Sequence, residues 1–174
     1  MRTNVLKVLS VLVLAGSAAL LFEHSAVAFP AVGPGELLGT WNVTVSLVDC
    51  QSGDPLSPPS PPFSSLLTFN LGGTMAEDTT NPAFGPGQRG AGQGVWEIKG
   101  RETYDAKSTA FINYTTAPNP AAHNPGFEAG QQTITQTIIK DGPNKWHSTA
   151  SIEFTDVNST VYRQGCAVAT AKRL

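Results

Sequence analysis

Apolar and polar residues alternate along most of the chain after residue 40. In residues 41–47, WNVTVSL, every odd-numbered position is apolar and every even-numbered position is polar. A period of two predicts a β-strand with one buried face. Similar segments predict further strands over residues 67–71, 74–80, 95–99, 103–115, 131–140, 145–155 and 160–171. No segment outside the N-terminal region has a convincing helical period, so the pattern predicts an all-β protein.

Turn-forming residues lie between the predicted strands and join them as hairpins. Gly72-Gly73 predicts a two-residue turn, because glycine tolerates a positive φ at both positions. Residues 141–144, DGPN, are also turn formers. Three segments are too rich in proline or glycine for regular strands and predict loops: residues 55–62, 81–94 and 116–126.

Eight strands in hairpin order predict an antiparallel meander, which has two exposed edges unless the sheet closes. Closure into a small barrel removes both edges. We therefore expect one eight-stranded β-barrel domain over residues 39–174, with a lead-in segment over residues 29–38. A two-sheet β-sandwich is the alternative.

The first 28 residues have the pattern of a signal peptide. Arg2 and Lys7 form a short basic region, residues 8–22 are almost entirely apolar, and Ala26-Val27-Ala28 matches a small-x-small cleavage site. The apolar run is short for a membrane span of about 20 residues, although an uncleaved anchor is an alternative. We therefore expect a secreted or periplasmic protein with no membrane attachment after cleavage.

Composition and charge exclude two further classes of protein. The chain has 11 basic and 13 acidic residues, a formal net charge of −2, so we expect no basic surface for nucleic acid. Hydrophobic residues make up 40% of the chain and charged residues only 14%. This balance is the opposite of the composition typical of disordered proteins.

Cys50 and Cys166 lie near opposite ends of the predicted barrel domain. In an oxidising compartment an even number of cysteines predicts a disulfide. The bridge would join the first and last strands, as barrel closure requires, although a Greek-key sandwich can also bring terminal strands together. A redox pair or metal ligands are the alternative, which the absence of a CxxC motif disfavours.

Motifs for catalysis, cofactors and metals are weak. Residues 85–90, GPGQRG, spell a dinucleotide-binding fingerprint, but no strand-to-helix unit surrounds them, so we expect a mobile loop and no cofactor. A zinc site needs three or four converging ligands, and His147 has only Glu153 and distant acids available. Four acidic residues could pair as in a glycosidase, but exposed strand faces are the simpler interpretation: Glu77, Asp78, Glu97 and Glu102. We therefore predict no catalytic residues and no metal ligands.

Gly39-Thr40-Trp41 opens the first predicted strand, and a long loop and meandering hairpins follow. A G-x-W at this point resembles the lipocalin-like (calycin) β-barrels. The chain is also similar to a type of short exported bacterial protein of unassigned function, with the same G-T-W start and a G-V-W strand, here Gly94-Val95-Trp96. The resemblance implies that Trp41 plugs the closed end of the barrel and that a cation from the last strand lies over its ring.

Arg173 is the expected barrel-closing cation over Trp41. If Cys50 lies directly opposite Cys166 in an antiparallel pair, Val43 faces Arg173, and Arg173 is then diagonal to Trp41. Strict alternation also puts Cys50 on the face opposite Trp41. The bridge is therefore expected outside the barrel or after a bulge.

The resemblance implies a cup for a small apolar ligand, since an eight-stranded barrel either fills with side chains or holds one small ligand. The candidate pocket residues are apolar residues expected to face inward: Trp41, Val43, Val45, Phe69, Trp96, Phe111, Trp146 and Phe154. The preferred hypothesis is an exported, non-catalytic barrel that binds a small hydrophobic molecule. The alternatives are a structural or interaction domain with a filled core, and a barrel enzyme of cyclase or isomerase type, against which the lack of an acid–base cluster counts.

Overall fold

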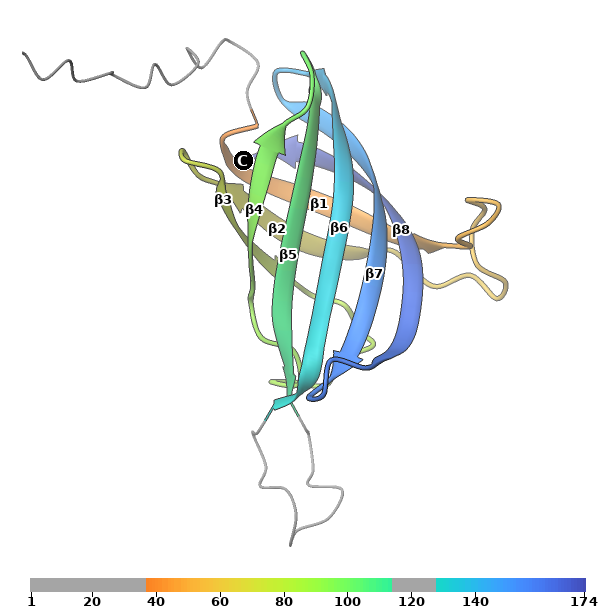
Figure 1. Ribbon diagram of the computed structural model, residues 1–174. Coiled ribbons are helices and arrows are strands. Elements are labelled where there is room, and N and C mark those ends of the chain that lie inside the picture. Colours follow the sequence, from red (N-terminus) through yellow and green to blue (C-terminus); the bar gives the residue numbers. More distant parts are fainter. Residues whose placement is uncertain (1–36, 114–127) are drawn as a thin grey trace, which may run out of the picture. The chain divides into compact units, whose positions relative to one another are not determined.

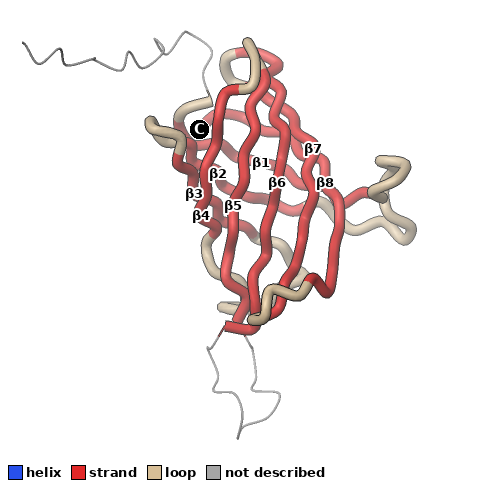
Figure 2. Tube along the Cα trace, in the orientation of Figure 1, coloured by secondary structure: helices blue, strands red, loops and turns tan. Residues whose placement is uncertain are grey.

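The computed structural model describes residues 37–113 and 128–174 and confirms the all-β prediction. Figure 2 shows only strands and loops in this part of the chain. The eight strands are β1 (Gly39–Val48), β2 (Phe63–Phe69), β3 (Thr74–Thr79), β4 (Gly92–Ile98), β5 (Thr103–Asn113), β6 (Glu128–Gly142), β7 (Lys145–Asp156) and β8 (Val161–Arg173). The predicted signal peptide, residues 1–28, lies outside the described residues. Within the described ranges, no helix is long and apolar enough to cross a membrane.

The sheet is a closed barrel, so the sandwich alternative is wrong. Each strand pairs antiparallel with its neighbours in the chain, and β1 also pairs with β8 (Figure 1). The closing ladder runs from the pair Trp41–Arg173 to the pair Val48–Cys166. The Leu174 N–H donates to the Thr40 carbonyl at 3.1 Å, which extends the contact between the C-terminal end and β1. Closure leaves no strand edge exposed for pairing with another chain.

Several strand boundaries differ from those predicted. The second strand is β2, residues 63–69, because Leu71 lies in the following turn with 75% of its surface exposed. Gly72 and Gly73 both have a positive φ, 92° and 83°, as this turn requires. β4 begins at Gly92, inside a segment that the sequence predicted to be loop. The Gly-rich composition of that segment concealed the start of the strand.

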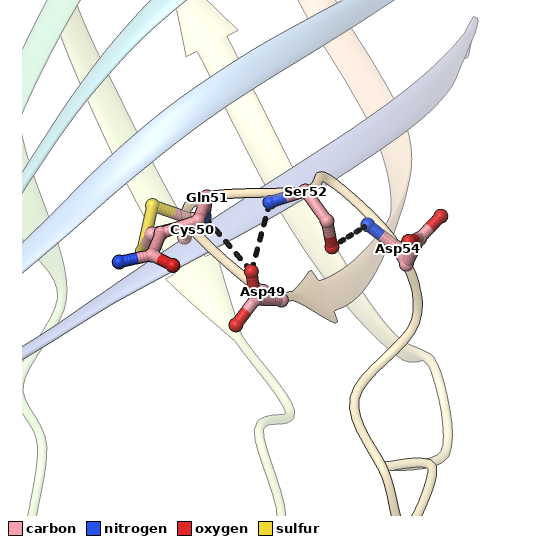
Figure 3. The surroundings of a disulfide bond; sticks show 6 residues. Asp49, Cys50, Gln51, Ser52 and Asp54 are labelled. Atoms are coloured by element: carbon pink, nitrogen blue, oxygen red, sulfur yellow. Dashed lines mark hydrogen bonds between the residues drawn. A yellow bond between two sulfur atoms is a disulfide. The ribbon is translucent and has the colours of Figure 1, made fainter.

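The Cys50–Cys166 disulfide is present, but the register around it differs from the expected one. Cys50 lies in the turn after β1 (Figure 3). Cys166 lies in β8 opposite Val48. The bridge therefore joins a turn to a strand, and the strand pairs are shifted by two residues from the prediction. Arg173 lies directly opposite Trp41.

Alternation sets the two faces of each strand, and it corrects one predicted pocket residue. In β5 the buried positions are even-numbered, from Tyr104 to Ile112, whereas Phe111 is 57% exposed. Phe111 therefore lies on the outer face and cannot line an interior pocket. The polar residues Asp105 and Lys107 share its face. The alternation along the whole strand therefore decides which way Phe111 faces, although its large aromatic side chain alone would favour burial.

Large side chains fill the end of the barrel where β1 begins, which we call the closed end. Trp41 and Trp146 are buried there with ring centroids 6.0 Å apart. Leu37, just before β1, is fully buried against them, and its carbonyl accepts a hydrogen bond from Trp41 Nε1 at 2.7 Å. The rest of this core is Val43, Leu67, Phe69, Met75, Tyr104, Ala106, Ile138 and Ala171.

Candidate functional site

The middle of the barrel is lined by small side chains, in contrast to the closed end. Inward positions of β7 and β8 carry Ser148, Ala150, Ala167 and Ala169. Ser65 on β2 faces the same space. Because these side chains are too short to meet across the barrel, they leave an inner cavity of about 50 Å³. Its remaining wall residues are Val43, Val45, Phe63, Leu67, Glu77, Thr79, Asn81, Gln132, Ile134, Gln136 and Ile152.

A larger hollow of about 410 Å³, the mouth pocket, lies at the opposite end, where β1 ends and β8 enters the closing ladder. Its volume falls within the roughly 300–1,000 Å³ typical of small-molecule sites. The end of β1 and the turn after it, residues 47–51, form one side with Leu56, and residues 163–166 of β8 form another. The other wall residues are Asn81, Ala83, Phe84, Gln132, Ile152 and Phe154.

Aromatic side chains contribute much of the mouth pocket's apolar wall. The ring centroids of the wall residues Phe84 and Phe154 are 6.2 Å apart, and the exposed Tyr162 ring, outside the pocket wall, lies 6.1 Å from that of Phe154. The Arg163 guanidinium carbon lies 5.3 Å from the centre of the Phe154 ring. This cation–π contact holds the arginine against the wall of the pocket.

Three residues line both spaces, so the mouth pocket and the inner cavity adjoin: Asn81, Gln132 and Ile152. Gln132 is only 3% exposed, and its Oε1 accepts a hydrogen bond from Arg89 Nε. Asn81 Oδ1 accepts a hydrogen bond from the Ala83 N–H at 2.9 Å. The junction between the two spaces therefore has two amide side chains whose oxygens are already bound.

An ion pair is buried next to this junction. Arg89 Nη2 lies 3.0 Å from Glu77 Oε1, and the two side chains are 4% and 7% exposed. Ser108 Oγ donates to the other carboxylate oxygen at 3.0 Å. Arg89 Nη1 also donates to the Gly90 carbonyl at 3.1 Å. The guanidinium is thus held by a carboxylate, a carbonyl and the Gln132 amide.

Sequence reasoning missed this ion pair. It placed Arg89 in a mobile loop and interpreted Glu77 as one acid on an exposed strand face. Glu77 in fact occupies an inward position of β3, and Gly92 on β4 makes room for it, because a Cβ at residue 92 would lie 2.8 Å from Glu77 Oε2. The usable signal was the odd-numbered phase of β3, which places Glu77 on the same face as buried Met75.

The predicted pocket residues separate into four groups. Val43 and Val45 line the inner cavity, and Phe154 lines the mouth pocket. The other interior aromatic residues belong to the closed-end core and line neither space: Trp41, Phe69, Trp96 and Trp146. Trp96 is half-buried, and its Nε1 donates to the Asn70 carbonyl at 3.1 Å. Phe111 lies outside, as described above.

Arg173 lies over Trp41, with its guanidinium carbon 4.2 Å from the ring centroid. Lys140 Nζ also lies near this ring, 5.3 Å from the centroid, so two cations contact the indole. Gly39 has a φ of 108°, and a Cβ there would lie 2.9 Å from Arg173 Nη1. The backbone conformation therefore favours glycine at the start of the G-x-W motif, and the missing side chain leaves room for the Arg173 guanidinium.

The turn that carries Cys50 is ordered by Asp49 (Figure 3). Its Oδ1 accepts the Ser52 N–H at 2.8 Å and the Gln51 N–H at 2.9 Å. These backbone hydrogen bonds, first from Ser52 and then from Gln51, lower the pKa of Asp49 from its ordinary value of 3.8. Within residues 37–113 and 128–174, no group of three or more His, Cys, Asp or Glu side chains could hold a metal ion.

Comparisons with known proteins do not assign the chain to a family. No family model matches the sequence. No curated protein matches it either. Among solved structures, the fold is similar to a chain described as EF1p2_mFAP2b bound to DFHBI, with 17% sequence identity and a TM-score of 0.46. The match covers 79% of this chain and 94% of that chain.

Proposed function

We propose that this protein is an exported, non-catalytic β-barrel that binds one small, largely apolar molecule in the mouth pocket. The observation that carries the proposal is the pocket of about 410 Å³ beside the inner cavity. A barrel that served only as a structural domain would be expected to fill its interior at the density of ordinary protein cores. The small inward residues of β7 and β8 leave space instead.

The chemistry of the pocket wall supports an apolar ligand. Leu47, Val48, Leu56, Phe84, Ile152 and Phe154 supply aliphatic and aromatic surface. Transfer of apolar ligand surface from water to such a wall is favourable by roughly 25 cal/mol per Å² of area. The disulfide at the rim is consistent with an oxidising, extracytoplasmic compartment, which supports export.

Gly165 provides a direct test, because it lines the mouth pocket and a Cβ built on it would meet nothing within 4 Å. Gly165→Leu should extend an aliphatic side chain into the pocket from a Cβ that meets no neighbouring atom. We expect N-phenylnaphthylamine, an uncharged dye that fluoresces in apolar surroundings, to bind the wild type at about one molecule per chain. Gly165→Leu should weaken this binding at least about tenfold.

Thr170→Leu is the matched control, since Thr170 lies on β8 but on the exposed, outer face. It adds a similar aliphatic side chain outside the barrel and should leave dye binding unchanged. Absence of saturable binding to the wild type, or equal binding by Gly165→Leu and the wild type, would contradict the proposal. Circular dichroism should verify that both variants remain folded.

A further inference from the structure

At the junction of the cavities, the hydrogen-bond partners of Gln132 and Asn81 determine which side-chain atom of each amide is the oxygen and which is the nitrogen. An arginine has only hydrogen-bond donors, so the Gln132 atom that faces Arg89 must be the oxygen. The Ala83 backbone N–H is likewise a donor, so the Asn81 atom that faces it must be the oxygen. The nitrogen of each amide is therefore the side-chain polar atom that remains available to a ligand in the cavities.

Neither amide nitrogen has a hydrogen-bond partner within the described part of the chain, whereas both residues line the mouth pocket and the inner cavity. Gln132 is only 3% exposed, yet among the described residues the side-chain polar atom that is fully buried without a partner is Trp146 Nε1, so the Gln132 amide nitrogen keeps access to the cavity space. Such a donor binds water when no ligand is present, and a ligand acceptor replaces that water with a direct hydrogen bond.

From this arrangement we infer that the ligand of the mouth pocket carries an uncharged hydrogen-bond acceptor, such as a ketone, aldehyde or ester carbonyl. The acceptor lies at the junction, where it receives hydrogen bonds from the amide nitrogens of Gln132 and Asn81. The inference rests on the proposed binding function and names the chemical class of the ligand.

The charges near the junction favour a neutral group over a carboxylate. The positive charge of Arg89 is paired with Glu77, and Glu77 itself lines the inner cavity. An anionic group at the junction would meet two neutral amides and the nearby Glu77 carboxylate, whereas Arg163, the cation that lines the mouth pocket, lies against the Phe154 ring. A carbonyl oxygen gains the same hydrogen bonds without this repulsion.

Two probes that differ in one oxygen test the inference. The first is a propionyl-substituted dimethylaminonaphthalene, and the second is its propyl counterpart, which lacks only the carbonyl oxygen. The quantity measured is the ratio of the two affinities, because the aromatic contribution is common to both probes. A third probe with a carboxylate in place of the ketone tests the role of charge.

Two substitutions remove the donors in different ways. Gln132→Met keeps the length of the side chain but removes the amide. Asn81→Asp replaces the amide nitrogen with oxygen and keeps the oxygen that accepts the Ala83 N–H, so its turn should be retained. We expect each to weaken ketone binding by about 3- to 10-fold, with propyl-probe affinity within about twofold of wild type. Gln93→Met, on the exposed face of β4, is the control and should change neither affinity.

A fall in the ratio of ketone to propyl affinity in either folded variant supports the inference. An unchanged affinity ratio in both variants overturns it, even if the pocket binds apolar dyes. Tighter or equal binding of the carboxylate probe overturns the preference for an uncharged group. If neither the ketone nor the propyl probe binds the wild type, the binding function itself fails, which is a separate result.

Discussion

Arg89 and Glu77 form an ion pair inside the barrel, with 3.0 Å between Nη2 and Oε1, although 12 residues of sequence separate them. Arg89 belongs to the connection between β3 and β4, and its side chain reaches inward to a carboxylate on β3. Arg89 also binds Gln132 on β6. One arginine thus attaches a loop to two strands of the barrel wall.

Arg89→Met should reduce the free energy of unfolding by about 3–5 kcal/mol, because it leaves the buried Glu77 carboxylate without its cation. The double variant Glu77→Met/Arg89→Met should lose less than the sum of the two single variants, since neither charge remains buried alone. Urea unfolding of the four proteins measures this coupling.

The exposed pair Lys99–Glu97 is the control, with 2.8 Å between Nζ and Oε1 and side chains 49% and 67% exposed. Lys99→Met should reduce the free energy of unfolding far less than Arg89→Met, because solvent screens an exposed ion pair. Similar losses for Arg89→Met and Lys99→Met would show that the interior pair is not shielded from water.

Trp41→Ala should reduce the free energy of unfolding by about 3–5 kcal/mol, the usual cost of truncating a buried aromatic residue. Trp41 has no exposed surface, and the change also removes the contacts with Trp146, Leu37 and Arg173. Phe111→Ala is the comparison, because Phe111 is 57% exposed and its loss should cost under about 1 kcal/mol. A loss of under about 1 kcal/mol for Trp41→Ala would place Trp41 outside the core.

Removal of the disulfide should lower the unfolding midpoint without unfolding the barrel at room temperature. The bridge spans 116 residues of sequence, and the chain-entropy model sets its contribution at no more than about 5 kcal/mol. The β1–β8 ladder from Trp41 to Val48 remains to close the barrel. Thermal unfolding of Cys50→Ser/Cys166→Ser measures the effect, and a variant already unfolded at room temperature would mean that closure depends on the bridge.

Asp49 should remain ionised at pH values below its ordinary pKa of 3.8, because the Ser52 and Gln51 N–H groups bind its charged form. A lowered pKa gives a stabilisation that is complete above the unfolded-state pKa and is lost as pH falls through the folded-state pKa. The stability difference between the wild type and Asp49→Asn should therefore be constant well above pH 3.8 and shrink as the pH falls below that value. Carboxyl NMR titration measures the pKa directly, and a value at or above 3.8 would contradict the expectation.

Much of the architecture followed from the sequence alone. Alternation from Trp41 to Leu47 and in the later segments predicted the strands, because a pleated strand repeats every two residues. Hairpin order then predicted closure, since a meander of eight strands otherwise leaves two edges. The cysteine pair was predicted from its number and its expected compartment.

Tertiary structure decided how far along the barrel axis each side chain lies, which we call its level, and where the loop residues lie. Alternation assigns a face but not a level, because the level depends on the register between strands. The tryptophans Trp41 and Trp146 are therefore in the closed-end core, whereas Phe154 lies at the mouth. Arg89 has no periodic pattern around it, so the sequence does not indicate that it points inward. Its backbone bridge with Ile112 and its side-chain contacts with Glu77 and Gln132 hold it there.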